Sequence, residues 1–394
     1  MVDQPGPPTT DDWSHGQTAR VVPAELYFDL AFVFCLVQIS YSVSSDLAPL
    51  NLLRGLLMIL LIWTVWVGFA WIGNFERERA RLEQLSWFRI LMVVTVASLI
   101  VLGMAIPEGF GDQSSIFVGA FVVISVLYVI GFLYVTRDSP ATRRSFRAIL
   151  PMQLVLPVSL VVSAVIDKVP WSPIVISVGL ASALLATRFR GHDQWSINAE
   201  HADERFGLFI FIVLGEIIIA LGFGASETHR FGPPVVVSIV CGVVFSAALW
   251  WIYFSLVASS GADRLERLSE AERARVARVV YTYLHGALVV ICAFLAVGIE
   301  VATAEPLHKV EEPFNLIIPT ALSLFIVTVF IIRRTLTGTF EWRLLIPAVT
   351  LLVAIPLGMW LPAIWVEVVC AGLLVFFVLG RELQTRALEL PWPR

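Results

Sequence analysis

The stretch ELYFDLAFVFCLVQIS, residues 25–40, decides the class of this protein. Most of its residues are apolar, as in a helix that enters lipid, yet Glu25 and Asp29 lie four residues apart on one helical face. An Asp at the centre of a membrane helix costs about 2.5–3.5 kcal/mol on insertion scales. Two carboxylates on one face of such a helix therefore indicate either a polar function inside the bilayer or ion pairs that fix helix packing.

The composition of the whole chain agrees with a lipid environment. Of its 394 residues, 58% are hydrophobic and 15% are charged, and the mean hydropathy is +0.83. A soluble protein of this length cannot bury so much apolar side chain, so the expected partner is the lipid bilayer. The net charge of −4 and the lack of a basic, aromatic-rich patch argue against nucleic acid as a partner. Residues 1–20 lack the basic start that is typical of a cleaved signal peptide.

The spacing of the cysteines gives no reason to expect a metal or cofactor site. The four cysteines lie singly inside apolar runs, at Cys35, Cys241, Cys292 and Cys370. This pattern predicts buried free thiols and contains neither a disulfide framework nor a CxxC metal site. The chain also lacks a GxxxxGK[ST] phosphate loop, so it carries no ATP-hydrolysing module of its own.

Apolar runs separated by polar breaks recur along the chain, each close to the ~20 residues that cross a ~30 Å hydrocarbon core. They lie at about 24–45, 50–73, 85–106, 114–136, 147–166, 171–189, 204–224, 233–257, 278–301, 314–333, 341–360 and 361–381. The expected fold is an all-α, polytopic membrane protein with about twelve transmembrane helices. Only Leu361, Pro362 and their neighbours separate the last two runs, which leaves a re-entrant hairpin or one long broken helix as alternatives.

The distribution of positive charge predicts the orientation in the membrane. Of the 27 Lys and Arg residues, only Arg54, Lys168, Arg230 and Lys309 lie in one set of loops, and Arg89 lies within a run. The remaining 22 lie in the alternate loops and the two tails. By the positive-inside rule, both termini are cytoplasmic and the protein is a multi-pass protein of the inner (plasma) membrane.

The even number of runs suggests the hypothesis that the chain consists of two similar six-helix halves. Adding 179 to the residue number maps Glu25 onto Glu204, Phe32 onto Phe211 and Trp71 onto Trp250. Two six-helix repeats would be parallel, related by an axis along the membrane normal, although chance similarity between Phe- and Val-rich helices is an alternative. The expected domains are a tail at 1–23, halves at 24–203 and 204–381, and a tail at 382–394.

A second unusual stretch, NAEHADERFGLFIFIVLGEIIIALGFG, covers residues 198–224. His201, Glu204 and Arg205 cluster at its start, whereas Glu216 stands in the middle of an unbroken apolar run. At 1.5 Å per residue, Glu216 lies ~18 Å from Glu204, near the bilayer midplane, and Arg205 and Glu216 fall on nearly the same helical face.

Together, ELYFDLAFVFCLVQIS and HADERFGLFIFIVLGE resemble the bacterial low-temperature-requirement A (LtrA) family, over about residues 20–380. The pattern H-x-x-E-R-x-G-L-F-x-x-x-x-L-G-E is the more specific part of this resemblance. Ala202 stands where that family is expected to have an aromatic residue, which bears on local packing only. The resemblance implies a polytopic inner-membrane protein associated with growth in the cold, and it supplies no molecular activity.

The two carboxylates of the first predicted run (24–45), Glu25 and Asp29, have structural as well as functional interpretations. Glu25 is close enough to the headgroups to be an interfacial acid favoured by the helix dipole. Asp29 lies deeper, and Arg89, at a similar depth in the third run, is its expected ion-pair partner. Such a pair either fixes helix packing or gates a path.

Glu216 is the main candidate for function. No opposite charge is predictable at its depth, so the hydrocarbon disfavours its charged form and the carboxyl is expected to be protonatable. A proton- or cation-coupled carrier needs such a group near the midplane. The alternative is a protonated Glu that hydrogen-bonds to a neighbouring helix, with Gly215 allowing close approach.

The remaining polar candidates are weaker. His201 and Glu204 have HxxE spacing, but without a third ligand an interfacial histidine beside a salt bridge is favoured over a metal site. His285 is either a proton relay or a hydrogen-bonded core histidine. The tryptophans are interpreted as interface anchors and include Trp63, Trp66, Trp71, Trp250 and Trp251.

These residues predict a polar vestibule that leads from the cytoplasm towards the midplane. It would contain Glu25, Asp29, Arg89, His201, Glu204, Arg205 and His285, with Glu216 beyond them. The favoured function is a secondary transporter or permease for an unknown small molecule or ion, with Glu216 as the coupling acid and Asp29–Arg89 as a gating pair.

Three alternatives are an ion channel, a non-transporting sensor and a membrane enzyme. Phe28-Asp29 resembles the Phe-Ser-Asp helix that starts each six-helix repeat of the endolysosomal two-repeat potassium channels. The serine is missing here, and the second half has Phe206-Gly207 without an Asp. No catalytic motif is found, so the chain is not expected to be an enzyme. A homo-oligomer is left open.

Overall fold

The structure is a computed structural model. It describes residues 21–74, 86–137, 140–166, 171–189, 198–228, 231–257, 265, 267–309, 316–353, 355–358 and 360–389. Among these residues there are helices and their connections and no β-strand. Most of the predicted N-terminal tail (1–20), the basic loop at 75–85 and the region at 190–197 before the predicted second half lie outside the described residues.

The first six predicted runs are all helical. They form α2 (Pro23–Ser45), α3 (Pro49–Gly73), α5 (Ser86–Ala105), α6 (Ser114–Val135), α7 (Pro140–Ile166) and α8 (Trp171–Phe189). Helices α2 and α3 begin with a proline, which suits the first turn because the amide hydrogen it lacks would have no partner there. Helix α7 carries Pro151 and Pro157 in its interior.

The last six predicted runs are helical too. They form α9 (Ala199–Glu227), α10 (Pro233–Leu256), α12 (Glu270–Ala277) with the π-helix η2 (Arg278–Leu284) and α13 (His285–Ala304), α14 (Ile317–Thr337), η4 (Trp342–Leu344) with α15 (Leu345–Val353) and α16 (Ile355–Gly358), and α17 (Ala363–Glu389). The capping box of Ser269 and Glu272 starts α12.

The class of fold is therefore confirmed, whereas the number of spans is not. In the described part of the chain, eight helices are long and apolar enough to cross a membrane, and four shorter apolar helices lie at 89–105, 150–165, 173–185 and 342–353. The eleventh run is the one that differs most from an uninterrupted helix. Its described residues form the 3₁₀ turn η4 and the helices α15 and α16, and α16 contains Pro356, which cannot donate a helical backbone hydrogen bond.

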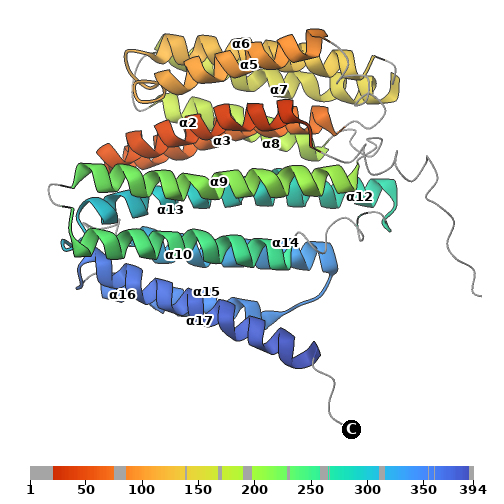
Figure 1. Ribbon diagram of the computed structural model, residues 1–394. Coiled ribbons are helices and arrows are strands. Elements are labelled where there is room, and N and C mark those ends of the chain that lie inside the picture. Colours follow the sequence, from red (N-terminus) through yellow and green to blue (C-terminus); the bar gives the residue numbers. More distant parts are fainter. Residues whose placement is uncertain are drawn as a thin grey trace, which may run out of the picture.

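The helices lie side by side in a bundle, with α5, α6 and α7 at one edge and α15, α16 and α17 at the opposite edge (Figure 1). Helices α2, α3, α9 and α13 meet in the middle, where α2 packs against α9 and α13, and α3 packs against α13. The two ends of the bundle are named here by α9: its N-terminal end holds Ala199 and its C-terminal end holds Glu227.

Every main helix contact in α2–α8 has a counterpart in α9–α17. The first set is α2–α3, α2–α5, α3–α6, α3–α8, α5–α6, α6–α7 and α7–α8. The second set is α9–α10, α9–α13, α10–α14, α10–α17, α13–α14, α14–α15 and α15–α17.

The outside of the bundle is apolar, as expected of a surface in lipid. Exposed side chains on different helices include Leu30, Val158, Val243 and Phe376. The four cysteines are free and buried, which confirms the prediction made for them.

Candidate functional site

Paired polar side chains follow the line along which α2 and α9 pack. Their partners are separated by 176 positions in sequence, as in Asp29 with Arg205 and Ser40 with Glu216. Glu25 and His201 keep the same separation, with Nε2 of the histidine 3.4 Å from the glutamate Oε1. A constant separation means that two parallel helices meet in one register, so the predicted common face of Arg205 and Glu216 is turned towards α2.

The charged pair of this seam is fully enclosed. Arg205 holds Asp29 with both terminal nitrogens, and its Nη2 donates to Oδ1 at 2.6 Å. Trp66 Nε1 donates to the same oxygen at 2.7 Å. Asp29 is 0% exposed and Arg205 is 2% exposed. A bidentate pair with an extra donor is the arrangement that compensates best for the burial of two charges.

The partner predicted for Asp29 was wrong. Arg205 of α9 replaces Arg89 of α5, whose side chain is exposed. The prediction used depth alone, whereas a partner must also face α2 from a neighbouring helix. Asp29 lies on the face of α2 that packs against α9.

An aromatic cluster lies beside the charged pair. Trp66 stacks on Phe209 with ring centroids 3.7 Å apart and on Trp63 at 5.2 Å. Phe32 meets Phe209 edge to face at 5.1 Å, and the guanidinium of Arg205 lies 5.0 Å from the Trp66 ring. Trp63 and Trp66 are buried, so the interpretation of these two as interface anchors was wrong.

The N-terminal end of α9 is fastened to α2 and α3. Asn198 caps α9 by accepting a hydrogen bond from the His201 amide at 2.9 Å, and its own amide donates to Asn74 at the end of α3, also at 2.9 Å. Glu204 is exposed and accepts a hydrogen bond from the Val21 amide at 3.1 Å. His201 and Glu204 therefore have separate partners, in agreement with the non-metal interpretation.

Glu216 lies further along the seam, where it is 1% exposed and accepts a hydrogen bond from Ser40. One turn beyond Ser40, Ser44 donates to Glu300 of α13 at 2.6 Å. The two serines lie on one face of α2 and so connect a carboxyl of α9 with a carboxyl of α13. Within the described residues, Oε2 of Glu216 has no hydrogen-bond partner.

A third buried carboxyl lies outside the seam. Glu367 of α17 is 0% exposed and accepts a hydrogen bond from Ser238 of α10 at 3.0 Å, while Ser238 is 2.9 Å from Thr303 of α13. This group connects the three helices by hydrogen bonds in the second half.

His285 begins α13 immediately after the π-helix and uses both ring nitrogens. Its Nδ1 lies 2.8 Å from the Val280 carbonyl, and its Nε2 lies 2.8 Å from the Tyr253 hydroxyl. A carbonyl only accepts, so Nδ1 is the donor and Nε2 of a neutral ring accepts from the tyrosine. This geometry fits a hydrogen-bonded core histidine, which was one of the two expected interpretations.

Residues 20–379 match the sequence profile described as bacterial low temperature requirement A protein (LtrA). The chain belongs to the LtrA family. This confirms the resemblance of the two motifs, both of which contribute to the seam between α2 and α9.

This LtrA-family protein is 28% identical over 312 residues to an uncharacterized protein of Rhizobium meliloti (strain 1021). The match covers 74% of this chain and 71% of the relative. No solved structure matches the chain.

Ser40, Glu300 and Glu367 were not among the predicted site residues, and Trp66 was predicted only as an interface anchor. Ser40, Trp66, Glu300 and Glu367 all contact the polar groups described above. The two glutamates were detectable as carboxylates inside apolar runs. Glu300 stands at the end of the run 278–301, where an acid is ordinarily interfacial, whereas Glu367 is the seventh residue of the run 361–381 and was detectable in the same way as Asp29. Among the described residues, no group of three or more His, Cys, Asp or Glu side chains is placed to hold a metal ion.

Proposed function

We propose that this LtrA-family protein is a secondary transporter, coupled to a proton or another cation through Glu216. The supporting observation is the column of polar groups along the α2–α9 seam. It runs from Glu25 to Ser44 on α2, a rise of ~28 Å that matches the ~30 Å hydrocarbon core. Buried ionisable groups are costly in lipid and are typical of transport paths.

The column of polar groups is interrupted between the Asp29–Arg205 pair and the Ser40–Glu216 pair. Asp29 and Ser40 are separated by eleven residues, or ~16 Å of helix, and the space between them holds Phe32 and Phe209 in edge-to-face contact. A carrier requires such a barrier because it must never connect both sides of the membrane at once. In this proposal, the Asp29–Arg205 pair gates the path at the N-terminal end of α9.

Glu216 is the coupling acid in this proposal. A carboxyl that is closed off from water and has one hydrogen-bond donor can exist in protonated and charged forms, and each form favours a different arrangement of its neighbours. Ser44 and Glu300 continue the path towards the C-terminal end of α9.

The same proposal includes two parallel six-helix repeats. The matching contacts of α2–α8 and α9–α17 support it, since equivalent helices make equivalent contacts in each half. An axis along the membrane normal would then pass close to α2 and α9, which begin the two halves. Transporter sites commonly lie at such an interface between repeats.

The test uses purified protein in liposomes that hold a pH-sensitive dye. Inorganic cations and then metabolites are screened against an imposed proton gradient, and the wild type is compared with Glu216→Gln. The substitution keeps the shape of the side chain and removes its proton exchange, so coupled proton movement should be abolished. Glu200→Gln, an exposed position in the first turn of the same helix, is the control and should behave as wild type.

Each other result points to a different function. Unchanged coupled transport by Glu216→Gln would remove the coupling role. Ion flux without a substrate would favour the channel. No flux under any condition, with folded protein confirmed, would favour a sensor or a membrane enzyme and leave Glu216 as a packing residue.

A further inference from the structure

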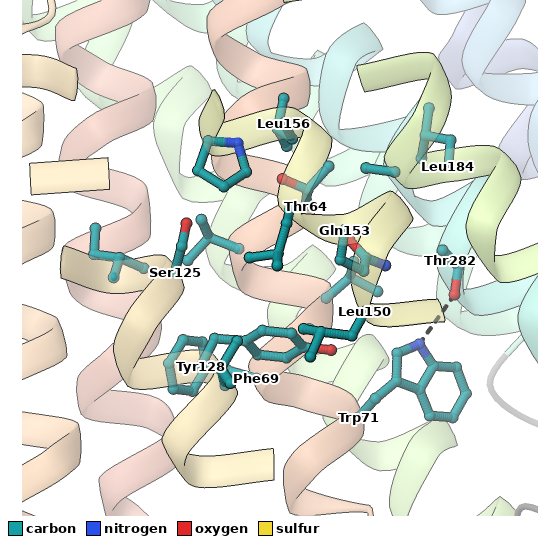
Figure 2. Close-up of a pocket in the computed structure, with 18 of the residues that line it drawn as sticks. Thr64, Phe69, Trp71, Ser125, Tyr128, Leu150, Gln153, Leu156, Leu184 and Thr282 are labelled. Carbon is teal, nitrogen blue, oxygen red and sulfur yellow. Dashed lines mark hydrogen bonds between the residues drawn. The ribbon is translucent and has the colours of Figure 1, made fainter. Parts of the chain in front are cut away.

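A cavity of about 110 Å³ lies mainly between helices of the first half of the molecule. Its walls come from α3, α6, α7 and α8, with α12 and the π-helix η2 closing one side (Figure 2). We call it the first-half cavity. An engineered apolar cavity of about 150 Å³ stays dry and binds benzene, so a space of this size suits an apolar group.

Part of the wall of the first-half cavity is apolar. Phe121 and Ile124 of α6 and Leu156 of α7 contribute to it. Two hydroxyls also lie here, but each donates to a carbonyl of its own helix: Thr64 to Leu61 at 2.7 Å and Ser125 to Phe121 at 2.8 Å. This part of the wall therefore favours hydrocarbon.

The other part of the wall carries polar groups. Trp71, Gln153, Thr282, Arg278 and Tyr128 line it, and Trp71 donates a hydrogen bond to the Thr282 hydroxyl (Figure 2). In the part of the chain that the structure describes, the Tyr128 hydroxyl and the Gln153 amide make no hydrogen bond. The cavity thus offers hydrogen-bonding groups as well as hydrocarbon.

The first-half cavity borders the lipid-facing surface of the bundle. Leu154 lines it and is also 44% exposed, on the outer face of α7 that Val158 and Val161 continue. Pro157 lines it as well, and it cannot donate the helical hydrogen bond to the carbonyl of Gln153. A molecule that enters here comes from the hydrocarbon of the bilayer.

We propose that the first-half cavity binds an acyl chain of a membrane phospholipid. The chain would lie against Phe121 and Ile124, and the polar part of the lipid would lie towards Gln153, Tyr128 and Arg278. The site is separate from the α2–α9 seam, so the proposal stands whether or not the protein transports a substrate.

The test uses the full-length protein in phosphatidylethanolamine and phosphatidylglycerol vesicles. These contain increasing amounts of a phosphatidylglycerol with a diazirine near the end of one acyl chain. After irradiation, mass spectrometry locates the label. A bound chain should label the cavity wall in a saturable manner, whereas label on the outer surface, for example at Val243, should rise in proportion to the probe.

Two variants make the test specific. Ser125→Phe should fill the cavity and lower the label on its wall by about tenfold or more, which corresponds to a loss of about 1.4 kcal/mol in binding. Ser98→Phe is the matched control, because Ser98 also donates to its own helix, at 2.8 Å, but does not line the cavity. It should leave the labelling unchanged.

Two results would overturn the proposal. One is wall labelling in the wild type that rises in proportion to the probe without saturation. The other is equal wall labelling in wild type and in folded Ser125→Phe. Should Ser125→Phe not fold, the saturation measurement on the wild type decides alone.

Discussion

Arg205 shows how a single charged side chain is accommodated between membrane helices. Its guanidinium binds both oxygens of Asp29, lies over the ring of Trp66 and donates to the Glu25 carbonyl at 3.3 Å. These contacts replace most of the water that both charges have lost, and within the described residues only the Nε of Arg205 in this pair has no hydrogen-bond partner. Each partner is therefore costly to remove alone, because the remaining charge would stay buried.

We predict that Arg205→Met destabilises the protein by about 3–5 kcal/mol, the usual cost of leaving one member of a buried pair unpaired. Asp29→Asn in the same chain should restore part of this loss, since it removes the orphaned charge and keeps an acceptor for Trp66. Melting temperatures of the purified variants in detergent would show both effects.

The control for this experiment is Arg333→Met. Arg333 donates to Glu341 at 2.7 Å, but this salt bridge is partly exposed, and such pairs contribute about 0–1 kcal/mol. Equal losses for the two arginine variants would contradict the role given to burial.

At the scale of elements, the π-helix η2 connects the first-half cavity with the α2–α9 seam. Thr282 lines the first-half cavity and accepts hydrogen bonds from two tryptophans of α3: Trp71 binds its hydroxyl at 3.0 Å and Trp63 binds its carbonyl at 2.9 Å. Trp63 in turn stacks on Trp66, which binds Asp29. The cavity and the charged pair are thus joined through packed aromatic rings.

We predict that Thr282→Val lowers stability by about 0.5–1.5 kcal/mol, because the Trp71 indole N–H loses its acceptor while the side-chain volume is kept. A lower melting temperature in detergent would record this. Thr335→Val is the control, since Thr335 donates only to its own helix, at 2.8 Å to the Ile331 carbonyl. Identical melting temperatures for both variants would show that the contact to Trp71 contributes nothing.

At the scale of the whole molecule, the twelve runs could be predicted because each is a mainly apolar stretch of suitable length. The register between α2 and α9 could not, since a hydropathy pattern gives depth but not which face meets which neighbour. This is why the partner of Asp29 was assigned to Arg89 and why Trp66 was placed at the interface. Glu216 was found because its apolar surroundings are visible in the sequence itself.

The orientation is a prediction at this scale. With both termini in the cytoplasm, Glu305, after α13, faces outward, and Thr339, after α14, faces the cytoplasm. In spheroplasts, Glu305→Cys should react with a membrane-impermeant maleimide, whereas Thr339→Cys should react only after the membrane is opened. The four natural cysteines are buried and serve as a silent background. The reverse pattern of labelling would place the termini outside.

The π-helix also determines which way the side chains of α13, in the ninth predicted run, point relative to those of α12. Its i→i+5 hydrogen bonds accommodate one residue more than an α-helix would hold, and one residue corresponds to about 100° of rotation. Removing that residue would turn α13 relative to α12, so that Thr282 could face α3 or Glu300 could face Ser44, but not both. Thr282 faces α3 and Glu300 faces Ser44 in the same helix because the π-helix adds a single residue between α12 and α13.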